Sequence, residues 1–528
     1  MRSIGLKLIG ALLAGVGLSF FSCAPPQPTA PAGWTGRFGG IEGDFMNHMT
    51  VDRDGNIIAV GSAGHDALDL NGDGDTLDPG EPLRPFHGDD DGLILKLDPT
   101  GRYLWAVRLG GGGFDSCMWA DTDSAGNIVV TGETWGEADL SGDGDYNDPG
   151  ETPVPGLHGD GDCFMAKFSP AGDCLWTLRL GGLQADEGVC VAVNSRDRIV
   201  LAGGVEGDSD FSGDGRIDEP GYGYDDDETA GSPYGGRDMF VAEFEPNGIV
   251  NWLKRLGGGG LDRVNAVALD ASDAFILTGS VIGDADLDSD GAFTRPGETT
   301  GTVHGEQDVF VVKFNSTGHY QWSNRLGGPS QDFSDGVCVT AAGDVVLCGG
   351  IDQAVDLNGD GLLNTAQGEG GVSGVNGPAD AFLLKLSGAS GAFMWCARLG
   401  GMDEEEAAAV VEDDDGNLFL TGMSDGSMDF NRDGDTNDVG ERPTGIQAGV
   451  DVFACGFTAN GVLMWSRRMG GASYDLGLTA VTGGAFVLVG GQTKGAADLD
   501  GDGSLAGNIE IPPARFDKSD WFITAFPR

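Results

Sequence analysis

Seven acidic segments carry the residues whose types and spacing point most clearly to chemistry. Each begins with aspartate, places oxygen-bearing side chains at positions 1, 3 and 5, and has glycine at position 6, as in DLNGDGDTLDPGE from Asp69. In EF-hand loops this spacing turns three oxygens towards one hard cation, and the glycine permits the sharp turn. The sequence therefore predicts calcium as a cofactor, bound by seven loops.

The candidate metal ligands are the residues at positions 1, 3 and 5 and an acidic residue later in each loop. They are Asp69, Asn71, Asp73 and Glu81; Asp139, Ser141, Asp143 and Glu151; Asp210, Ser212, Asp214 and Asp218; Asp286, Asp288, Asp290 and Glu298; Asp356, Asn358, Asp360 and Glu369; Asp429, Asn431, Asp433 and Glu441; and Asp498, Asp500, Asp502 and Glu510. The alternative is a set of acidic turns without metal. Carboxylates crowded so closely repel one another strongly without a cation, which favours the metal interpretation.

The loops differ from EF-hands in length and setting. An EF-hand places its glutamate eleven positions after the first aspartate, whereas Glu81 and its counterparts lie twelve or thirteen positions after it, and no helices flank them. The third loop lacks such a glutamate, so weaker binding is expected there. The pattern is closer to the DxDxDGxxD loops of integrin α-chain propellers, which it resembles.

Two further sets of charged residues recur with the same period. We expect the members of each Asp–Arg pair to lie directly opposite each other in a hairpin and to form a structural ion pair, since every unit has one. These pairs are Asp91–Arg108, Asp162–Arg179, Asp238–Arg255, Asp308–Arg325, Asp380–Arg398, Asp451–Arg468 and, from the two chain ends, Asp520–Arg37. A third acidic residue is expected to contact either the metal or the arginine; the set is Asp44, Asp115, Asp186, Asp262, Asp332, Glu405 and Asp475.

The sequence offers little support for a catalytic site. His87, His158 and His304 occupy matching positions in HG[D/E]xD segments, and such repetition favours loop packing over catalysis. The chain contains no HExxH or Walker motif. An active site would need residues that break the repeat, and the sequence alone suggests no convincing set.

The elements that position the loops follow from a motif, W-x-x-R-x-G-G, which begins at Trp34, Trp105, Trp176, Trp252, Trp322, Trp395 and Trp465. Between two motifs, runs such as NIVVTG from Asn127 and DCFMAKF from Asp162 indicate strands, with turns at glycine and proline. Four strands per unit, and about 44 residues once the acidic segment is removed, match a propeller blade.

The two chain ends complement each other. The mature chain starts with an isolated fourth strand at Trp34 and ends with an isolated third strand from Asp520. This pattern predicts an all-β fold, a seven-bladed β-propeller with four antiparallel strands per blade over residues 34–528, closed by pairing of the N- and C-terminal strands. An open solenoid, the alternative, would need distinct capping repeats.

Strings within the repeat resemble a known family. DAFLLKL from Asp380, WCARLGG from Trp395 and DDDGNLFLTG from Asp413 are similar to the bacterial β-propeller repeats often called SBBP. The resemblance covers the mature chain and implies a propeller. It implies little about activity, since the family is defined by its blade.

The N-terminal segment is expected to be a targeting signal. Arg2 and Lys7 give the N-terminal region a positive charge, and residues 4–21 are mostly apolar. LSFFSC resembles the lipobox of bacterial lipoproteins, in which the cysteine is lipidated. We therefore expect a signal peptide at residues 1–22, and lipidated Cys23 followed by a proline-rich tether at 23–33. An ordinary secretory peptide is the alternative.

The composition of the chain limits the classes of partner it can bind. A net charge of −53 repels nucleic acid. The eight cysteines after Cys23 share no repeated spacing, although Cys338 and Cys348 flank one predicted hairpin and are candidates for a disulfide.

Two functions remain after the sequence analysis. The first is an exported, membrane-anchored, monomeric binding or scaffold module at the periplasmic or outer surface of the cell envelope, whose calcium loops stiffen one face for a protein or glycan partner. The alternative is a calcium-dependent polysaccharide hydrolase or lyase with its active site in the central funnel. Tyr222, Tyr224 and Tyr234 of the deviant third insert would suit either function.

Overall fold

The computed structural model describes residues 33–64, 66–71, 76, 88–155, 158–159, 161–211, 213, 235–301, 304–352, 354–363, 369, 377–438, 441–443, 447, 449–502, 504–505 and 518–528. Cys23 and the expected signal peptide lie outside these residues and stay predictions. All described strands belong to one unit, Gly33–Arg528. Within the described residues, no helix is long and apolar enough to cross a membrane.

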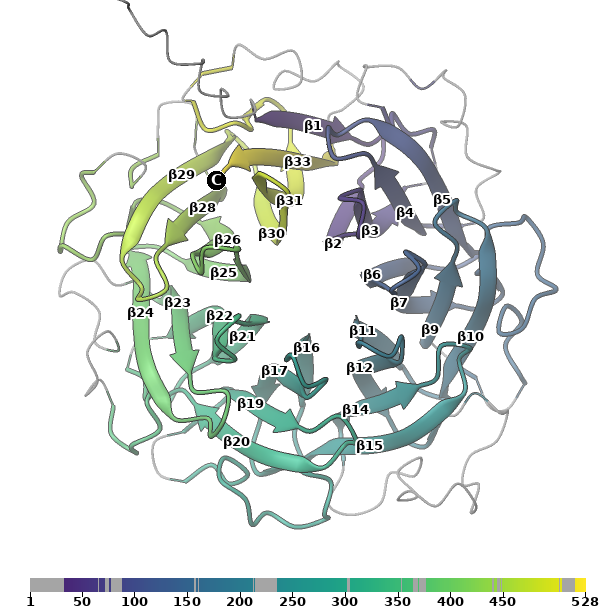
Figure 1. Cartoon of the computed structure of the whole chain (residues 1–528), viewed down its shortest axis with the longest axis horizontal. Helices are drawn as coiled ribbons and strands as arrows, with labels where there is room; N and C mark the ends of the chain where they lie inside the picture. The colour runs from purple at the N-terminus through teal and green to yellow at the C-terminus, as the bar shows by residue number, and fades with distance from the viewer. Residues whose placement is uncertain are drawn as a thin grey trace, which may run out of the picture. The chain divides into compact units, whose positions relative to one another are not determined.

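Seven antiparallel sheets stand as blades around a central channel (Figure 1). Blade 1 consists of β2 (Phe45–Val51), β3 (Ile57–Ala63), β4 (Asp91–Leu97) and β5 (Tyr103–Gly111). Blade 2 consists of β6 (Asp115–Thr122), β7 (Ile128–Trp135), β9 (Gly161–Phe168) and β10 (Cys174–Gly182). Blade 3 consists of β11 (Glu187–Val193), β12 (Ile199–Glu206), β14 (Arg237–Phe244) and β15 (Val250–Gly258). Blade 4 consists of β16 (Arg263–Leu269), β17 (Phe275–Val281), β19 (Asp308–Phe314) and β20 (Tyr320–Leu326).

The remaining three blades complete the ring. Blade 5 consists of β21 (Asp332–Val339), β22 (Val345–Asp352), β23 (Ala379–Leu386) and β24 (Phe393–Gly401). Blade 6 consists of β25 (Glu405–Glu412), β26 (Leu418–Ser424), β28 (Asp451–Phe457) and β29 (Leu463–Gly471). Blade 7 consists of β30 (Leu476–Gly483), β31 (Phe486–Lys494), β33 (Ser519–Pro527) and β1 (Trp34–Phe38). The predicted seven-bladed β-propeller is confirmed.

The hydrophobic core lies between neighbouring blades. Ile58 and Ile94 of blade 1 pack in one cluster with Ile128 and Phe164 of blade 2. The middle strands of a blade, such as β3 and β4, are buried along their whole length. Their continuous Val, Ile and Leu runs follow from this burial, because a middle strand packs against a neighbouring blade on each of its faces.

The motif tryptophan joins each blade to the next. Trp105 of blade 1 donates from Nε1 to Pro170 O at 3.1 Å, and a Cβ on Gly172 would lie 3.1 Å from its ring. The equivalent glycine of blade 1, Gly101, faces Trp34 of blade 7. The tryptophan therefore packs on the turn between the third and fourth strands of the following blade, and it does so across the seam of the ring as well.

The two motif glycines receive the start of the next acidic segment. Gly110 pairs with Asp139 in a two-residue strand, β8 (Ala138–Asp139), on the outer edge of blade 1. A Cβ on Gly111 would lie 1.7 Å from Glu137 O, so only glycine fits there. The same pairing recurs at β13 (Ser209–Asp210), β18 (Ala285–Asp286), β27 (Met428–Asp429) and β32 (Ala497–Asp498), and as single bridges at Asp69 and Asp356. Each acidic segment therefore adds a short strand to the preceding blade.

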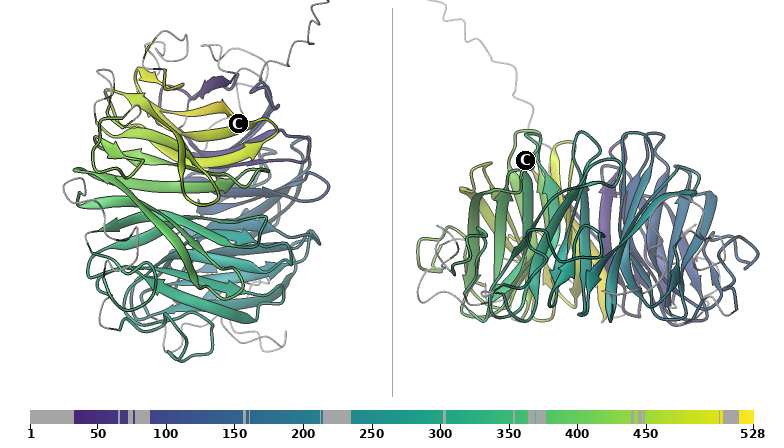
Figure 2. Two further views of the ribbon diagram at one scale, coloured as in Figure 1. Left: turned by 60° about the vertical axis from the view of Figure 1, so that its left-hand side comes forward. Right: turned by 90° about the horizontal axis from the view of Figure 1, so that it is seen from below.

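Ring closure occurs as predicted. β1 pairs with β33, and Arg37 lies opposite Phe522. The Arg37 guanidinium binds Asp520 Oδ2 through Nε and Nη2, at 2.8 and 2.5 Å, although the residues are 483 positions apart. Figure 2 shows blade 7 completed by strands from both chain ends.

Five of the other six Asp–Arg pairs form as ion pairs, and in the fourth blade Arg325 donates to Gly283 O instead of pairing with Asp308. The prediction that the pairs lie directly opposite is wrong. In blade 2, Arg179 is opposite Phe164, and its Nη1 reaches Asp162 Oδ2 diagonally at 2.9 Å. A β-bulge near the start of the outer strand contributes to this offset. Ion pairs of 2.5–3.7 Å occur in blades 1, 2, 3, 5, 6 and 7.

The possible disulfide is not formed. Cys338 lies opposite Val346 and Cys348 opposite Gly336 in the β21–β22 pair. All eight described cysteines are free thiols, most of them buried. They act as small apolar side chains in the core.

Candidate functional sites

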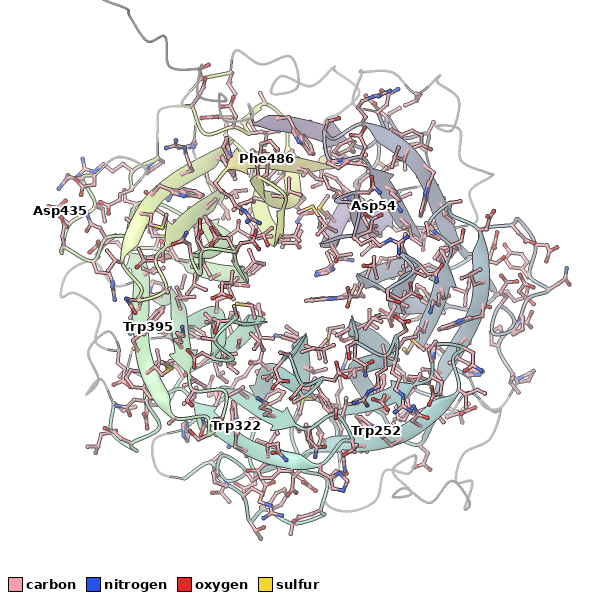
Figure 3. All side chains as sticks on the ribbon, in the orientation of Figure 1. Asp54, Trp252, Trp322, Trp395, Asp435 and Phe486 are labelled. Carbon is pink, nitrogen blue, oxygen red and sulfur yellow. The ribbon has the colours of Figure 1, made fainter. Side chains whose placement is uncertain are left out.

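The acidic loops lie on the outer circumference of the propeller. Asp435 of the sixth loop stands at the outer edge in Figure 3, well away from the channel. This position follows from the short strands, since each loop begins against the outermost strand of the preceding blade. Each described loop start contacts the preceding blade, and the expectation that the loops stiffen one face stays a prediction.

The first aspartate of each loop organises the turn around its own carboxylate. Asp139 accepts hydrogen bonds from Gly142 N at 2.6 Å and Asp143 N at 3.2 Å through Oδ1, and from Gly144 N at 2.7 Å through Oδ2. Equivalent bonds from loop amides reach Asp286, Asp356 and Asp429. The loop therefore curls around this carboxylate and brings positions 3 and 5 beside position 1.

Among the described residues, two loops bring three carboxylates together. Oxygens of Asp286, Asp288 and Asp290 lie within 4.8 Å of one another. The same holds for Asp498, Asp500 and Asp502. Carboxylate oxygens in such a group are the ligands that calcium prefers.

The late glutamate closes the loop instead of facing its acidic positions. Glu151 accepts from Leu140 N at 3.0 Å and Ser141 N at 3.1 Å through Oε1, and from Asp148 N at 2.8 Å through Oε2. Burial raises its pKa. Glu298, Glu369 and Glu441 are likewise buried and bound by loop amides. Backbone amides thus donate hydrogen bonds to both oxygens of this carboxylate. Whether the late glutamate also binds the metal stays a prediction.

The fourth loop has a feature that the sequence analysis missed. Arg295 donates from Nε to Asp288 Oδ2 at 2.5 Å, and its Nη2 lies 3.7 Å from Asp290 Oδ2. The guanidinium thus supplies positive charge to two carboxylates assigned to calcium. Position 10 of the other loops holds no basic residue, which was the available signal.

Several candidate ligands lie outside the described residues and stay predictions; they are Asp73, Glu81, Ser212, Asp214, Asp218 and Glu510. The tyrosines of the third insert and His87 also lie outside them. His158 and His304 each place Nδ1 3.2 Å from the aspartate that opens the third strand, Asp162 and Asp308. This contact agrees with loop packing.

The third acidic residue binds backbone amides where one blade passes into the next. Asp262 accepts from Gly258 N at 2.8 Å and from Ile282 N at 3.0 Å. Glu405 accepts from Gly401 N at 2.7 Å. Burial raises the pKa of Asp262 and Asp332 to about 7 and that of Glu405 to about 8. These carboxyls link the blades.

These raised pKa values set a pH dependence. In the unfolded chain such carboxyls titrate near about 4, so between that pH and 7–8 the folded state holds more protons. Their contribution to stability is full below about pH 4 and is lost as the pH rises through 7–8. His48 opposes this trend, because removal from water lowers its pKa to about 3, but it is a single group and the carboxyls with raised pKa values are several.

In chelator, the protein should therefore melt at a higher temperature at pH 5 than at pH 8. A melting temperature that rises from pH 5 to pH 8 would contradict this prediction.

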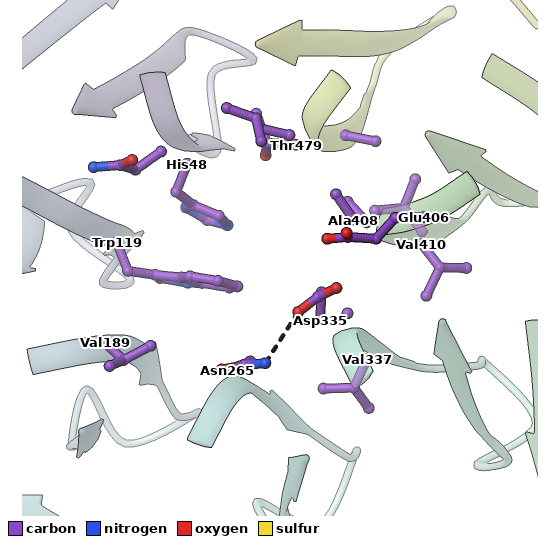
Figure 4. Close-up of a pocket in the computed structure, with 16 residues that line it drawn as sticks. His48, Trp119, Val189, Asn265, Asp335, Val337, Glu406, Ala408, Val410 and Thr479 are labelled. Atoms are coloured by element: carbon purple, nitrogen blue, oxygen red, sulfur yellow. Dashed lines mark hydrogen bonds between the residues drawn. The ribbon is translucent and has the colours of Figure 1, made fainter. Parts of the chain in front are cut away.

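The central channel gathers polar residues that the repeat analysis did not single out. They line a cavity of about 340 Å³ and come from the inner strands of five blades (Figure 4): Asn47, His48, Trp119, Asn265, Asp335 and Glu406. The rings of His48 and Trp119 stack with centroids 3.7 Å apart and planes 15° apart. Alignment of the seven inner strands by their first acidic residue was the signal that could have found this set.

Two carboxyl groups face this aromatic pair. Asp335 and Glu406 come from adjacent blades, and their side chains lie beside each other (Figure 4). Burial, followed by the charge of Glu406, raises the pKa of Asp335 well above its usual range. Burial also raises the pKa of Glu406. Coupled carboxyls in a cavity are a common feature of functional sites.

No protein-family model matches the chain, so the resemblance to SBBP repeats stays a prediction. The chain is similar to the regulatory protein FlaEY of Caulobacter vibrioides, with 25% identity over 253 residues, covering 47% of this chain and 23% of the relative. It is also similar to the uncharacterized WD repeat-containing protein L264 of Acanthamoeba polyphaga mimivirus, with 21% identity over 342 residues, covering 58% of this chain and 24% of the relative. The chain thus spans about a quarter of the length of these relatives. A WD-repeat relative fits the observed fold, since WD repeats form propeller blades.

Solved structures give weaker similarities. Sqt1 from Chaetomium thermophilum has a TM-score of 0.40 and 12% identity, covering 94% of this chain and 100% of that one. A protein of unknown function from Dyadobacter fermentans has a TM-score of 0.36 and 11% identity, with the same coverage. The gluconolactonase XC5397 from Xanthomonas campestris has a TM-score of 0.28 and 10% identity, covering 74% of this chain and 95% of that one. At these TM-scores none of the three carries an argument about function.

Proposed function

We propose that this protein is an exported, lipid-anchored, calcium-binding β-propeller that acts as a binding or scaffold module at the cell envelope. The observation that carries the proposal is the loop geometry. Asp286, Asp288 and Asp290 offer oxygens within 4.8 Å of one another, and loop amides hold the first of them in place. The pattern recurs in every blade.

Calcium at these loops would act between blades. Each loop starts as a strand on the preceding blade, as Asp139 does opposite Gly110. An ion bound there would fix the rim and leave the exposed loop surfaces available to a protein or glycan partner. We propose a monomer, and the net charge of −53 disfavours nucleic acid as a partner.

The enzymatic alternative has less support. Asp335 and Glu406 are the carboxyls that a hydrolase in the funnel would use, but their side chains interact directly. The two carboxyls of glycosidases stand about 5 Å or more apart, to leave room for the scissile bond. We therefore favour binding over glycan cleavage.

The calcium proposal predicts a metal-dependent stability. Each occupied site should stabilise the folded protein by about 2.7 kcal/mol when free calcium is about a hundredfold above its Kd. Calorimetry after exhaustive chelation should show a lower melting temperature, restored by calcium more effectively than by magnesium. An unchanged melting temperature together with metal-free purified protein would refute it.

Variants can test single loops by equilibrium dialysis with calcium. Replacing Asp500 and Asp502 by asparagine should remove one bound ion. Arg295→Asn should strengthen binding in the fourth loop, because it removes a guanidinium beside two candidate ligands. Asp414→Asn is the matched control, since that side chain is 95% exposed and outside the loops.

The anchor has its own test. Metabolic labelling with a palmitate analogue should mark the wild-type protein and leave Cys23→Ser unlabelled, since the LSFFSC junction is the only basis for the lipid. Equal labelling of the two would remove the anchor and leave simple secretion.

A further inference from the structure

The channel cavity is built from all seven blades, yet it is not sevenfold. Three positions after the conserved acidic position of the inner strand, the residues around the ring are Asn47, Met118, Val189, Asn265, Asp335, Ala408 and Leu478. In four blades this position is apolar, so the blade can form without a polar residue there. The two asparagines use their amides to bind the next blade. A carboxyl at this position costs free energy when it is partly removed from water, so Asp335 points to a ligand.

Hydrogen-bond acceptors outnumber donors in the lining. The Asn265 amide nitrogen donates to Ser334 O and to Asp335 Oδ1, both at 3.0 Å. The Asn47 amide nitrogen is likewise used, towards Ser116 Oγ at 3.0 Å and Cys117 O at 2.9 Å. Asp335 Oδ2 is buried and accepts no hydrogen bond from an amide or hydroxyl among the described residues; its neighbour is the Glu406 carboxyl. A ligand for this wall must bring N–H or O–H donors.

The residues that line the cavity also indicate the charge of the ligand. Two carboxyls, Asp335 and Glu406, face the cavity, and no lysine or arginine is among the described residues that line it. The chain carries a net charge of −53, which concentrates cations near its surface. These features favour a positively charged ligand.

The opposite wall suits the body of such a ligand. The stacked rings of His48 and Trp119 offer an aromatic surface, and Val189 lies beside them (Figure 4). Buried His48 is neutral, because burial lowers its pKa to about 3. An aromatic ring attracts an organic cation within about 6 Å of its centroid, so this wall complements the carboxyls.

We propose that the central channel binds a small organic ammonium ligand, with its charged amine at Asp335 and Glu406 and its apolar body against Trp119 and His48. The cavity volume of about 340 Å³ suits such a molecule. The binding is non-covalent and independent of the rim loops, because the two sites lie at different radii of the propeller.

Calorimetric titration of the purified protein with tryptamine tests the proposal. Saturable 1:1 binding is expected, and tryptophol, the neutral analogue with a hydroxyl in place of the amine, should bind about tenfold or more weakly. Asp335→Asn and Glu406→Gln should each weaken tryptamine binding by about tenfold or more, because each removes one of the two carboxyls that would bind the ammonium group. Glu306→Gln, which removes an exposed carboxylate outside the cavity, should leave it unchanged.

Each remaining outcome overturns the proposal. Equal affinity for tryptophol would identify an apolar pocket with no ammonium site. Loss of tryptamine binding in added calcium, with calcium binding itself abolished by Asp335→Asn, would identify a metal site. Binding of cellobiose in place of the amine would identify a glycan site. Absence of binding by tryptamine, cadaverine and choline to wild-type protein with an unchanged melting curve would also overturn it.

Discussion

Replacing Arg255 with methionine should lower the free energy of unfolding by about 3–5 kcal/mol, because it leaves a buried carboxylate without its counter-ion. Arg255 and Asp238 are fully buried. The guanidinium donates to Asp238 Oδ2 from Nε and Nη2, at 3.1 and 3.0 Å, and from Nη1 to Gly207 O at 2.7 Å. Denaturant unfolding in chelator, which removes any metal contribution, measures the loss.

Two further variants separate the ion pair from general damage. Arg196→Met is the matched control, since that guanidinium is 55% exposed and 3.7 Å from Asp273; it should change stability by less than about 1 kcal/mol. Adding Asp238→Asn to Arg255→Met should recover part of the loss, because the uncompensated charge is gone. If Arg255→Met and Arg196→Met lower the free energy of unfolding equally, the burial of the Asp238–Arg255 pair does not determine its contribution to stability.

The blade could be predicted because its determinants are local. The run NIVVTG from Asn127 and the turn at Gly172 fix strands and hairpins by residue type. The complementary chain ends at Trp34 and Asp520 then implied closure. The strand and turn signals depend on residues close together in the chain and recur from repeat to repeat, so they are unlike a chance match.

Contacts between blades could not be predicted in the same way. That Trp105 packs on Gly172, or that Asp139 pairs with Gly110, depends on the order and tilt of blades in space. The diagonal offset of Arg179 depends on a bulge that shifts the register by one residue. The spacing of residues in the sequence reveals neither the packing between blades nor the bulge.

The channel site was missed for the opposite reason. Among the seven blades Asp335 has no acidic equivalent and Glu406 has one, Glu187, so a search for what recurs treats both as variation within an inner strand. Their meaning appears only when the seven inner strands face one another and place these carboxyls opposite Trp119. A repeat protein built in this way specifies its fold by the residues that recur and its ligand by the residues that do not.

Removing the N-terminal strand should cause the largest loss of stability, because blade 7 takes its outer strand from the other end of the chain. Deletion of residues 34–40 leaves Asp520 buried without Arg37, a loss of about 3–5 kcal/mol from the ion pair alone. It also removes Trp34 from the turn at Gly101 and exposes the edge of β33. A bared edge strand pairs with other chains, so the variant should associate, which size-exclusion chromatography with light scattering would detect.

Crosslinking tests the same closure without damaging it. Thr35 and Thr524 face each other in the β1–β33 register, so Thr35→Cys combined with Thr524→Cys should form a disulfide within one chain. Each single variant controls for pairing with the eight native thiols, most of which are buried. Reduction should return the melting temperature of the crosslinked protein to that of wild type. Crosslinks between chains, or a deletion variant as stable as wild type, would mean that the ring is open in solution, since a closed propeller cannot lose the outer strand of one blade and keep the interfaces on both of its sides.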